Sequence, residues 1–181
     1  HYKLDTPIEV VWENTPTSTE TEDILGFQPR HDFNFLSVSQ MGPRKNLENT
    51  IKWFVEEFID QDVGLILKTS TNGEGFGLPL FEAARSALPI ITVGWSGQMD
   101  FLSDNGKEMF LKVKHQIGPV SSHSIWKGVI DEGANWAYAD QGSYKMALRQ
   151  MHKNYADFMS QAEELQAHVD TKFGDEVLFK G

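Results

Sequence analysis

The amino-acid sequence predicts an α/β fold in which a Rossmann-like parallel sheet is flanked by helices and followed by a long C-terminal helical segment. Strand-like and helix-like stretches alternate through most of the chain, which favours parallel β-α-β units. Residues 63–69 form a nearly continuous apolar run, typical of a strand buried on both faces of a parallel sheet. An apolar stripe at helical spacing occupies residues 144–169.

The beginning of the chain divides into an extension and the start of a compact domain. Residues 7–12 read as a short strand, and residues 13–23 are rich in Thr, Glu, Ser and Pro, as expected of a linker or solvated loop. We expect residues 1–30 to be an N-terminal extension and linker. Residues 31–181 would form one domain, because 181 residues with 40% hydrophobic content most simply bury one core.

A strand, a helix and a second strand are expected next. Residues 33–39 are strand-like, and residues 40–45 read as a loop. Apolar residues then recur at helical spacing through residues 47–59, with Asn46 as a fair N-cap. With the strand at residues 63–69, this part of the chain predicts a β-α-β unit.

Arg44 and Lys45 precede the first helix. Two cations at the positive end of a helix dipole are mildly unfavourable unless an anion lies between them and the helix. The alternative is that both side chains point into solvent at little cost.

A glycine-spaced loop, residues 73–77, leads into a helix and a buried strand. Glycine at every second position allows positive φ and close approach to a ligand. Pro79 suits the first turn of a helix that ends before Pro89, and residues 90–93 read as the strand behind it. Free N–H groups and the positive end of the helix dipole at such a start favour an anion.

Glu74 and Glu82 flank this helix start. Carboxylates beside an anion site are favourable if they accept hydrogen bonds from ribose or hexose hydroxyls, while amides and nearby cations take phosphates. The alternatives are that Glu82 only complements the dipole in a first turn and that the glycines only form a turn. The combination of the loop, the helix start and the glutamate pair favours a ligand site.

The rest of the chain is less regular. Residues 94–102 read as a glycine-flanked loop and helical turn at the carboxyl end of a strand, where ligands bind in open α/β sheets. Residues 109–113 predict a strand, residues 118–133 are irregular, and residues 135–139 are extended. The stripe at residues 144–169 predicts one helix or two in succession, and packing against the sheet is favoured over a coiled coil.

Composition limits the classes of function. The formal net charge is -10, with 26 acidic and 16 basic side chains, which disfavours nucleic acid or an anionic membrane as a partner. No Cys is present, which excludes disulfides and thiolate metal sites and fits a reducing compartment. The sequence contains neither a transmembrane segment nor a secretory pattern, so we expect a cytoplasmic protein.

Other motifs do not support a different chemistry. Asp60-Gln61-Asp62 matches the Asp-x-Asp pattern of some metal-binding sugar transferases, but it follows the first predicted helix, where a solvated loop is favoured. The six histidines show no metal-ligand spacing. The glycines at residues 73–77 fit neither the dinucleotide fingerprint nor a P-loop.

Together these residues resemble a known family. Residues 74–83, Glu-Gly-Phe-Gly-Leu-Pro-Leu-Phe-Glu-Ala, are similar to the Glu-x7-Glu signature of retaining nucleotide-sugar glycosyltransferases of the GT-B type, the glycosyltransferase group 1 type. Residues 87–91 resemble the family's small-Leu-Pro-Val-Ile continuation. Residues 35–39 with residues 44–46 resemble its first strand and basic loop, so the resemblance covers about residues 33–104.

The resemblance implies the roles of the site residues. The chain would be one half of a GT-B fold, the C-terminal domain that binds a nucleoside-diphosphate sugar without a metal or other cofactor. By position, Glu82 would accept the ribose hydroxyls, and Glu74 would be the catalytic residue that contacts the transferred sugar. The other donor-binding residues would be the cations Arg44 and Lys45 and the loop residues Gly75, Phe76, Gly77 and Leu78.

Two departures from the family pattern are expected to matter. The N-terminal domain that holds the acceptor, a glycan, lipid or protein, has no counterpart here, so this chain would bind donor but transfer poorly. The chain begins with His1, so we expect it to start inside a longer protein or after processing. Family members also place a further strand-helix unit, on the order of 30 residues, where only residues 70–73 intervene here. We therefore expect residues to be omitted near Ser70-Thr71.

Two other functions compete with this interpretation. One is a non-catalytic nucleotide-sugar-binding or interaction module. Sugar transfer by the full-length natural protein that is lost on Glu74→Ala would exclude it. The other is a sugar-phosphate enzyme such as a phosphorylase or an epimerase, which is disfavoured because no cofactor-lysine pattern is identified.

Overall fold

The computed structural model describes residues 9–12, 29, 31–39, 45–69, 77–125, 127 and 130–174. The chain divides into two compact units, His1–Gly73 and Glu74–Gly181, and each is described by itself. The predicted division into residues 1–30 and residues 31–181 stays a prediction.

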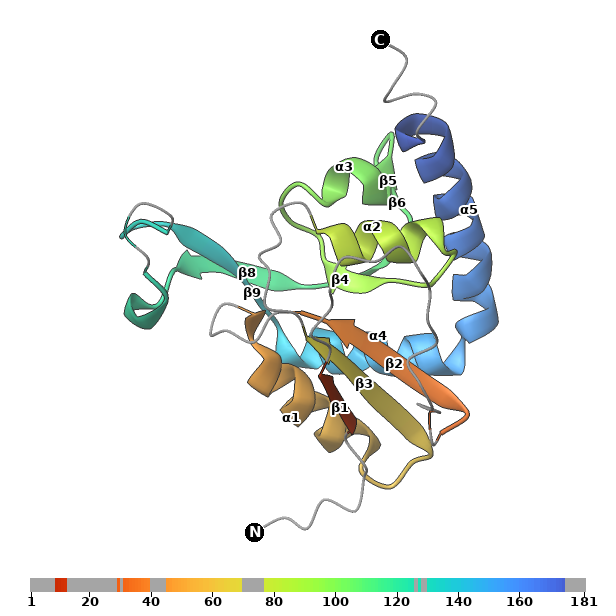
Figure 1. Cartoon of the computed structure of the whole chain (residues 1–181), viewed down its shortest axis with the longest axis horizontal. Helices are drawn as coiled ribbons and strands as arrows, with labels where there is room; N and C mark the ends of the chain where they lie inside the picture. The colour runs from red at the N-terminus through yellow and green to blue at the C-terminus, as the bar shows by residue number, and fades with distance from the viewer. Residues whose placement is uncertain are drawn as a thin grey trace. The chain divides into compact units, whose positions relative to one another are not determined.

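In the described residues of the first unit, three strands form a parallel sheet and one helix accompanies it (Figure 1). Its strands are β1 (Glu9–Trp12), β2 (Phe33–Val38) and β3 (Val63–Thr69), and α1 (Leu47–Phe58) connects β2 to β3. The strand order is β1-β3-β2, with β3 hydrogen-bonded to both neighbours in parallel. The predicted β-α-β unit is confirmed, and the apolar run forms the central strand β3.

Aromatic side chains join α1 to the sheet. The ring of Phe35 on β2 stacks on Phe58 at 5.8 Å and meets Phe54 edge-on at 6.1 Å between ring centroids. Phe54 and Phe58 are fully buried, as are Val63 and Leu67 on β3. Each large buried aromatic ring contributes about 1.5–3 kcal/mol relative to an exposed one. The first unit therefore has its own apolar core.

The second unit begins with α2 (Leu78–Arg85), followed by β4 (Ile91–Val93) and the short helix α3 (Met99–Leu102). β4 pairs in parallel with β7 (Leu111–Val113), with Thr92 opposite Lys112. The strand predicted at residues 109–113 is therefore confirmed at its C-terminal end. A short pair of strands between α3 and β7 is an addition to the prediction.

This pair is an antiparallel hairpin of β5 (Ser103–Asp104) and β6 (Lys107–Glu108). Its two-residue turn is Asn105-Gly106, and both residues have positive φ, 49° and 82°. Positive φ at both central positions is the requirement of a type I′ hairpin turn, which Asn-Gly meets with little strain. Asp104 and Lys107, which flank the turn, form ion pairs with Lys172 and Glu164 of a later helix.

A second antiparallel pair extends away from the helices of this unit (Figure 1). β8 (His115–Pro119) pairs with β9 (Asn135–Ala139), and the hydroxyl of Tyr138 donates to the carbonyl of Pro119 at 2.7 Å. The extended piece predicted at residues 135–139 is confirmed. The prediction of an irregular segment from residue 118 is wrong at its start, because Gly118 and Pro119 belong to β8.

The C-terminal stripe forms two helices, α4 (Gln141–Lys153) and α5 (Tyr155–Phe173), which break at Asn154. α4 packs on β7, whereas α5 packs on α2, α3 and α4. The predicted packing against the sheet is confirmed for α4, and α5 packs chiefly on other helices. The apolar core of this unit consists of Ala84, Ile90, Phe101, Leu102, Met109, Phe110, Leu165 and Val169.

The fold is mixed α/β, with small parallel and antiparallel sheets and a helical C-terminal segment. Within the described ranges, no helix combines the length and the apolar character that crossing a membrane requires.

Candidate functional site

Helix α2 begins on a glycine in a conformation that other residues adopt only with strain. Gly77 is the N-cap residue and has φ 82° and ψ 37°, the left-handed conformation, and no side chain caps the helix. Pro79 lies in the first turn, as predicted. Left-handed backbone costs roughly 1–2 kcal/mol for residues with a Cβ. The prediction that this glycine takes positive φ is confirmed.

The start of α2 leaves backbone donors exposed to a ligand. The carbonyl of Gly77 accepts hydrogen bonds from Leu80 at 2.9 Å and from Phe81 at 3.2 Å. The N–H groups of Gly77 and Leu78 donate to no residue that the structure describes. Unpaired N–H groups at the positive end of a helix dipole are the elements of an anion site.

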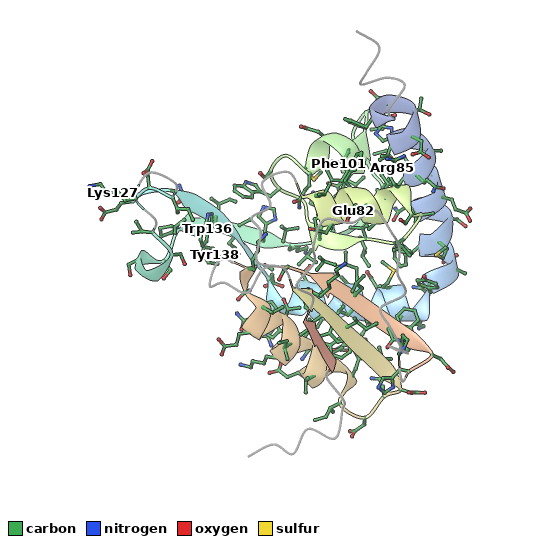
Figure 2. All side chains as sticks on the ribbon, in the orientation of Figure 1. Glu82, Arg85, Phe101, Lys127, Trp136 and Tyr138 are labelled. Atoms are coloured by element: carbon green, nitrogen blue, oxygen red, sulfur yellow. The ribbon has the colours of Figure 1, made fainter. Side chains whose placement is uncertain are left out.

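Glu82 is the fifth residue of α2, beyond the position of a capping acid. The first turn of α2 contains no acidic residue, because the helix starts at Leu78. The side chain of Glu82 is exposed, and among the described residues it forms no hydrogen bond or ion pair. Its neighbour Arg85 instead pairs with Asp170 at 3.6 Å. The alternative in which Glu82 serves the first turn is therefore wrong. Figure 2 shows the positions of Glu82 and Arg85.

The loop after β4 lies against the start of α2. The side-chain amide of Gln98 donates from Nε2 to Val93 O at 2.7 Å and to Thr92 Oγ1 at 3.1 Å. A Cβ added at Gly77 would lie 3.7 Å from the Cβ of Gln98. Ser96 in the same loop has φ 73°, an uncommon value for a residue with a Cβ. The start of α2 therefore lies beside the loop that follows the carboxyl end of β4.

Lys112 brings a positive charge to the same strand end. It is the β7 partner of Thr92, and its stem crosses Gly94, where an added Cβ would lie 2.5 Å from Lys112 Cε. Its ammonium pairs with Glu108 on β6. Sequence reasoning missed Thr92, Gln98 and Lys112, because only the strand register and the loop path bring them together.

In the first unit, Lys45 directly precedes the N-cap of α1. Asn46 is the N-cap residue, as predicted, but it has φ 53°, and its side chain accepts from Asn49 Nδ2 at 2.6 Å rather than capping the backbone. α1 therefore also begins without a side-chain cap. Lys45 is half-buried.

Four of the predicted site residues lie outside the described residues: Arg44, Glu74, Gly75 and Phe76. The same is true of the expected omission near Ser70-Thr71. Of the remaining residues, the structure brings Gly77, Leu78 and Glu82 together on α2. Lys45 belongs to the other unit, so its part in the site stays a prediction.

The two described side chains of the second unit with clearly shifted pKa values, Tyr144 and Asp104, do not belong to α2. Burial raises the pKa of Tyr144 to about 12. The hydrogen bond from Lys172 holds the pKa of Asp104 below its ordinary value, against an opposing effect of burial.

Asp60 and Asp62 are exposed, as expected, and Asp62 pairs with His31. Across the described part of the chain, no three His, Asp or Glu side chains gather as metal ligands would.

Comparisons with protein-family models, with curated proteins and with solved structures find no match to this chain. The resemblance to retaining glycosyltransferases rests on the residues of the glutamate motif and its surroundings.

Proposed function

We propose that this chain is the donor-binding part of a retaining nucleotide-sugar glycosyltransferase. The observation that carries the proposal is Glu82, an exposed carboxylate without a described partner, one turn along a helix that starts on left-handed Gly77. A carboxylate accepts hydrogen bonds only, so it suits the hydroxyl pair of a ribose. The uncapped N–H groups of Gly77 and Leu78 suit a phosphate.

The fold is consistent with this assignment. Each unit contains parallel strands, β2 with β3 and β4 with β7, and strands alternate with helices from β2 to α3. We infer a Rossmann-like domain, one half of a GT-B fold, from this alternation. Lys45 and Arg44 precede α1, where they would neutralise a diphosphate beside the helix start.

The chemistry follows from the charges that develop during transfer. Cleavage of the anomeric bond makes the sugar cationic and the leaving diphosphate anionic. The backbone amides at Gly77 and Leu78 would stabilise the anion as fixed donors. Glu74 would hold the transferred sugar through its hydroxyls, and the acceptor would come from a separate domain.

A thermal-shift panel tests the proposal. UDP-glucose, GDP-mannose and ADP-glucose are added to the purified chain, and a true donor at 100 times its Kd stabilises by about 2.7 kcal/mol, or roughly 5–10 °C. Glu82→Gln weakens binding roughly 10–100-fold, since hydrogen bonds to a charged group contribute about 1.5–3 kcal/mol. The matched control is Glu163→Gln, an exposed glutamate on α5.

The panel has a clear negative outcome. If further nucleotide sugars of other bases and sugars also leave the melting temperature unchanged, donor binding by this chain is refuted. If Glu82→Gln and wild type bind the nucleotide sugar with equal affinity, Glu82 does not contact the donor.

A further inference from the structure

The side-chain amide of Gln98 is held in one orientation. Nε2 has two protons, and both have acceptors, Val93 O at 2.7 Å and Thr92 Oγ1 at 3.1 Å. Rotation of the amide by 180° would place Oε1 against the carbonyl oxygen of Val93, which is repulsive. The Gln98 side chain therefore presents Oε1 on the side away from the end of β4.

Oε1 of Gln98 lies close to Gly77, the first described residue of the candidate site. A Cβ added at Gly77 would lie 3.9 Å from Oε1 of Gln98, so the space that glycine leaves open adjoins the oxygen. Among the described residues, no group donates a hydrogen bond to Oε1. The site thus offers an oriented acceptor beside the backbone donors of Gly77 and Leu78.

An oriented acceptor and a phosphate group do not attract each other. Phosphate oxygens are also acceptors, so direct contact with Oε1 would be repulsive, whereas a hydroxyl donates to an amide oxygen. A nucleotide sugar carries hydroxyls on both sides of its diphosphate, on the ribose and on the transferred sugar, and the proposed function assigns the ribose hydroxyls to Glu82. Gln98 is therefore suited to the sugar rather than to the diphosphate.

We propose that Gln98 is a sugar-binding residue of this site, and that its Oε1 accepts a hydrogen bond from a hydroxyl of the transferred sugar. The inference rests on the proposed function. Thr92 acts through Gln98 as a positioning residue, because its Oγ1 holds the amide in the required orientation.

The experiment compares nucleotide sugars with their nucleoside diphosphates. Affinities of UDP-glucose, GDP-mannose and ADP-glucose, and of UDP, GDP and ADP, are measured by calorimetry for wild type and Gln98→Met. Methionine keeps the length of the side chain and removes the acceptor. Loss of one hydrogen bond is expected to weaken the bound nucleotide sugar about fivefold and to leave its nucleoside diphosphate unchanged.

Two further variants keep the test decisive. Thr92→Val keeps Gln98 but removes one of the two acceptors that hold its amide, and the bond to Val93 O remains. It should therefore weaken the nucleotide sugar by a smaller factor with the same selectivity, even if Gln98→Met fails to fold. Gln116→Met, at an exposed position on β8, should change neither affinity.

The outcomes separate the two proposals. If the wild-type chain binds no nucleotide sugar, the proposed function and the role of Gln98 both fail. If wild type binds but Gln98→Met and Thr92→Val keep the ratio of the two affinities, only the role of Gln98 fails. An equal loss for the nucleotide sugar and the diphosphate also overturns it, because the contact would then lie on the nucleotide.

Discussion

The carboxylate of Asp140 accepts a hydrogen bond from the backbone N–H of Ser143 at 2.7 Å. This bond caps the start of α4, and the hydroxyl of Ser143 in turn accepts from the N–H of Lys114 at 2.9 Å. Asp140 also donates its own N–H to the carbonyl of Lys114 at 2.8 Å. Two of these three bonds tie Lys114, the residue after β7, to the start of α4.

Replacing Asp140 by Ala removes the cap and should lower the free energy of unfolding by about 1 kcal/mol. Asp140→Asn keeps a side-chain oxygen at the same position and should stay close to wild type, since Asn and Asp cap helices about equally well. Urea unfolding followed by circular dichroism measures both variants. Equal losses for Ala and Asn would show that the hydrogen bond to Ser143 contributes nothing.

Asp104 predicts how stability depends on acid pH. Its pKa is lowered from 3.8, chiefly by the hydrogen bond from Lys172 and further by the charges of Lys172 and His168, while burial opposes them. Folding thus favours the ionised form, and this stabilisation is complete above the unfolded pKa and lost as the pH falls through the folded one. Urea unfolding between pH 7 and pH 2 should show Asp104→Asn less stable than wild type, by a margin that narrows below about pH 4.

The control for this pH effect is Asp131→Asn, an exposed position. Its difference from wild type should not change over the same range. A constant margin for Asp104→Asn would contradict the assigned cause of the shift.

Gly77 and Gly97 form a matched pair of glycines for a test of backbone strain. Gly77 has φ 82°, whereas an added Cβ at Gly97 meets no atom within 4 Å and its φ lies outside the left-handed range. Gly77→Ala should therefore destabilise the chain by roughly 1–2 kcal/mol, and Gly97→Ala should be neutral or slightly stabilising. Chemical denaturation measures both. A stable Gly77→Ala variant would mean that α2 can begin with an ordinary backbone conformation.

The main helices and strands could be predicted because apolar spacing determines them. The run at residues 63–69 becomes the central strand β3, and the spacing through residues 47–59 becomes α1. Both segments contain fully buried side chains, Val63 and Phe58 among them. Burial of one face requires a periodic apolar pattern, and that pattern is visible in the amino-acid sequence itself.

The short antiparallel strands are harder to predict. β5 and β6 have two residues each, too few to show an alternating pattern, although Asn105-Gly106 between them is a known hairpin signal. β8 contains Gly118 and Pro119, which usually argue against a strand. Pairing with β9, rather than local preference, forms it.

The candidate site was predictable only in part. The positive φ of Gly77 follows from its spacing and its place before Pro79. The position of Glu82 beyond the first turn depends on where α2 begins, which a sequence rarely fixes to one residue. The contact of Gln98 with the start of α2 depends on the path of a loop, and no spacing along the chain encodes it.

The β5–β6 hairpin also sets the longitudinal alignment of α5. Lys107 pairs with Glu164, and Asp104 pairs with Lys172, about two turns further along the helix. A slide of α5 by one turn, about 5.4 Å, would separate both pairs at once. Because the pairs have opposite polarity, a slide of two turns would set Lys107 against Lys172 or Asp104 against Glu164. The two ion pairs of the hairpin therefore favour one alignment of α5 along its axis.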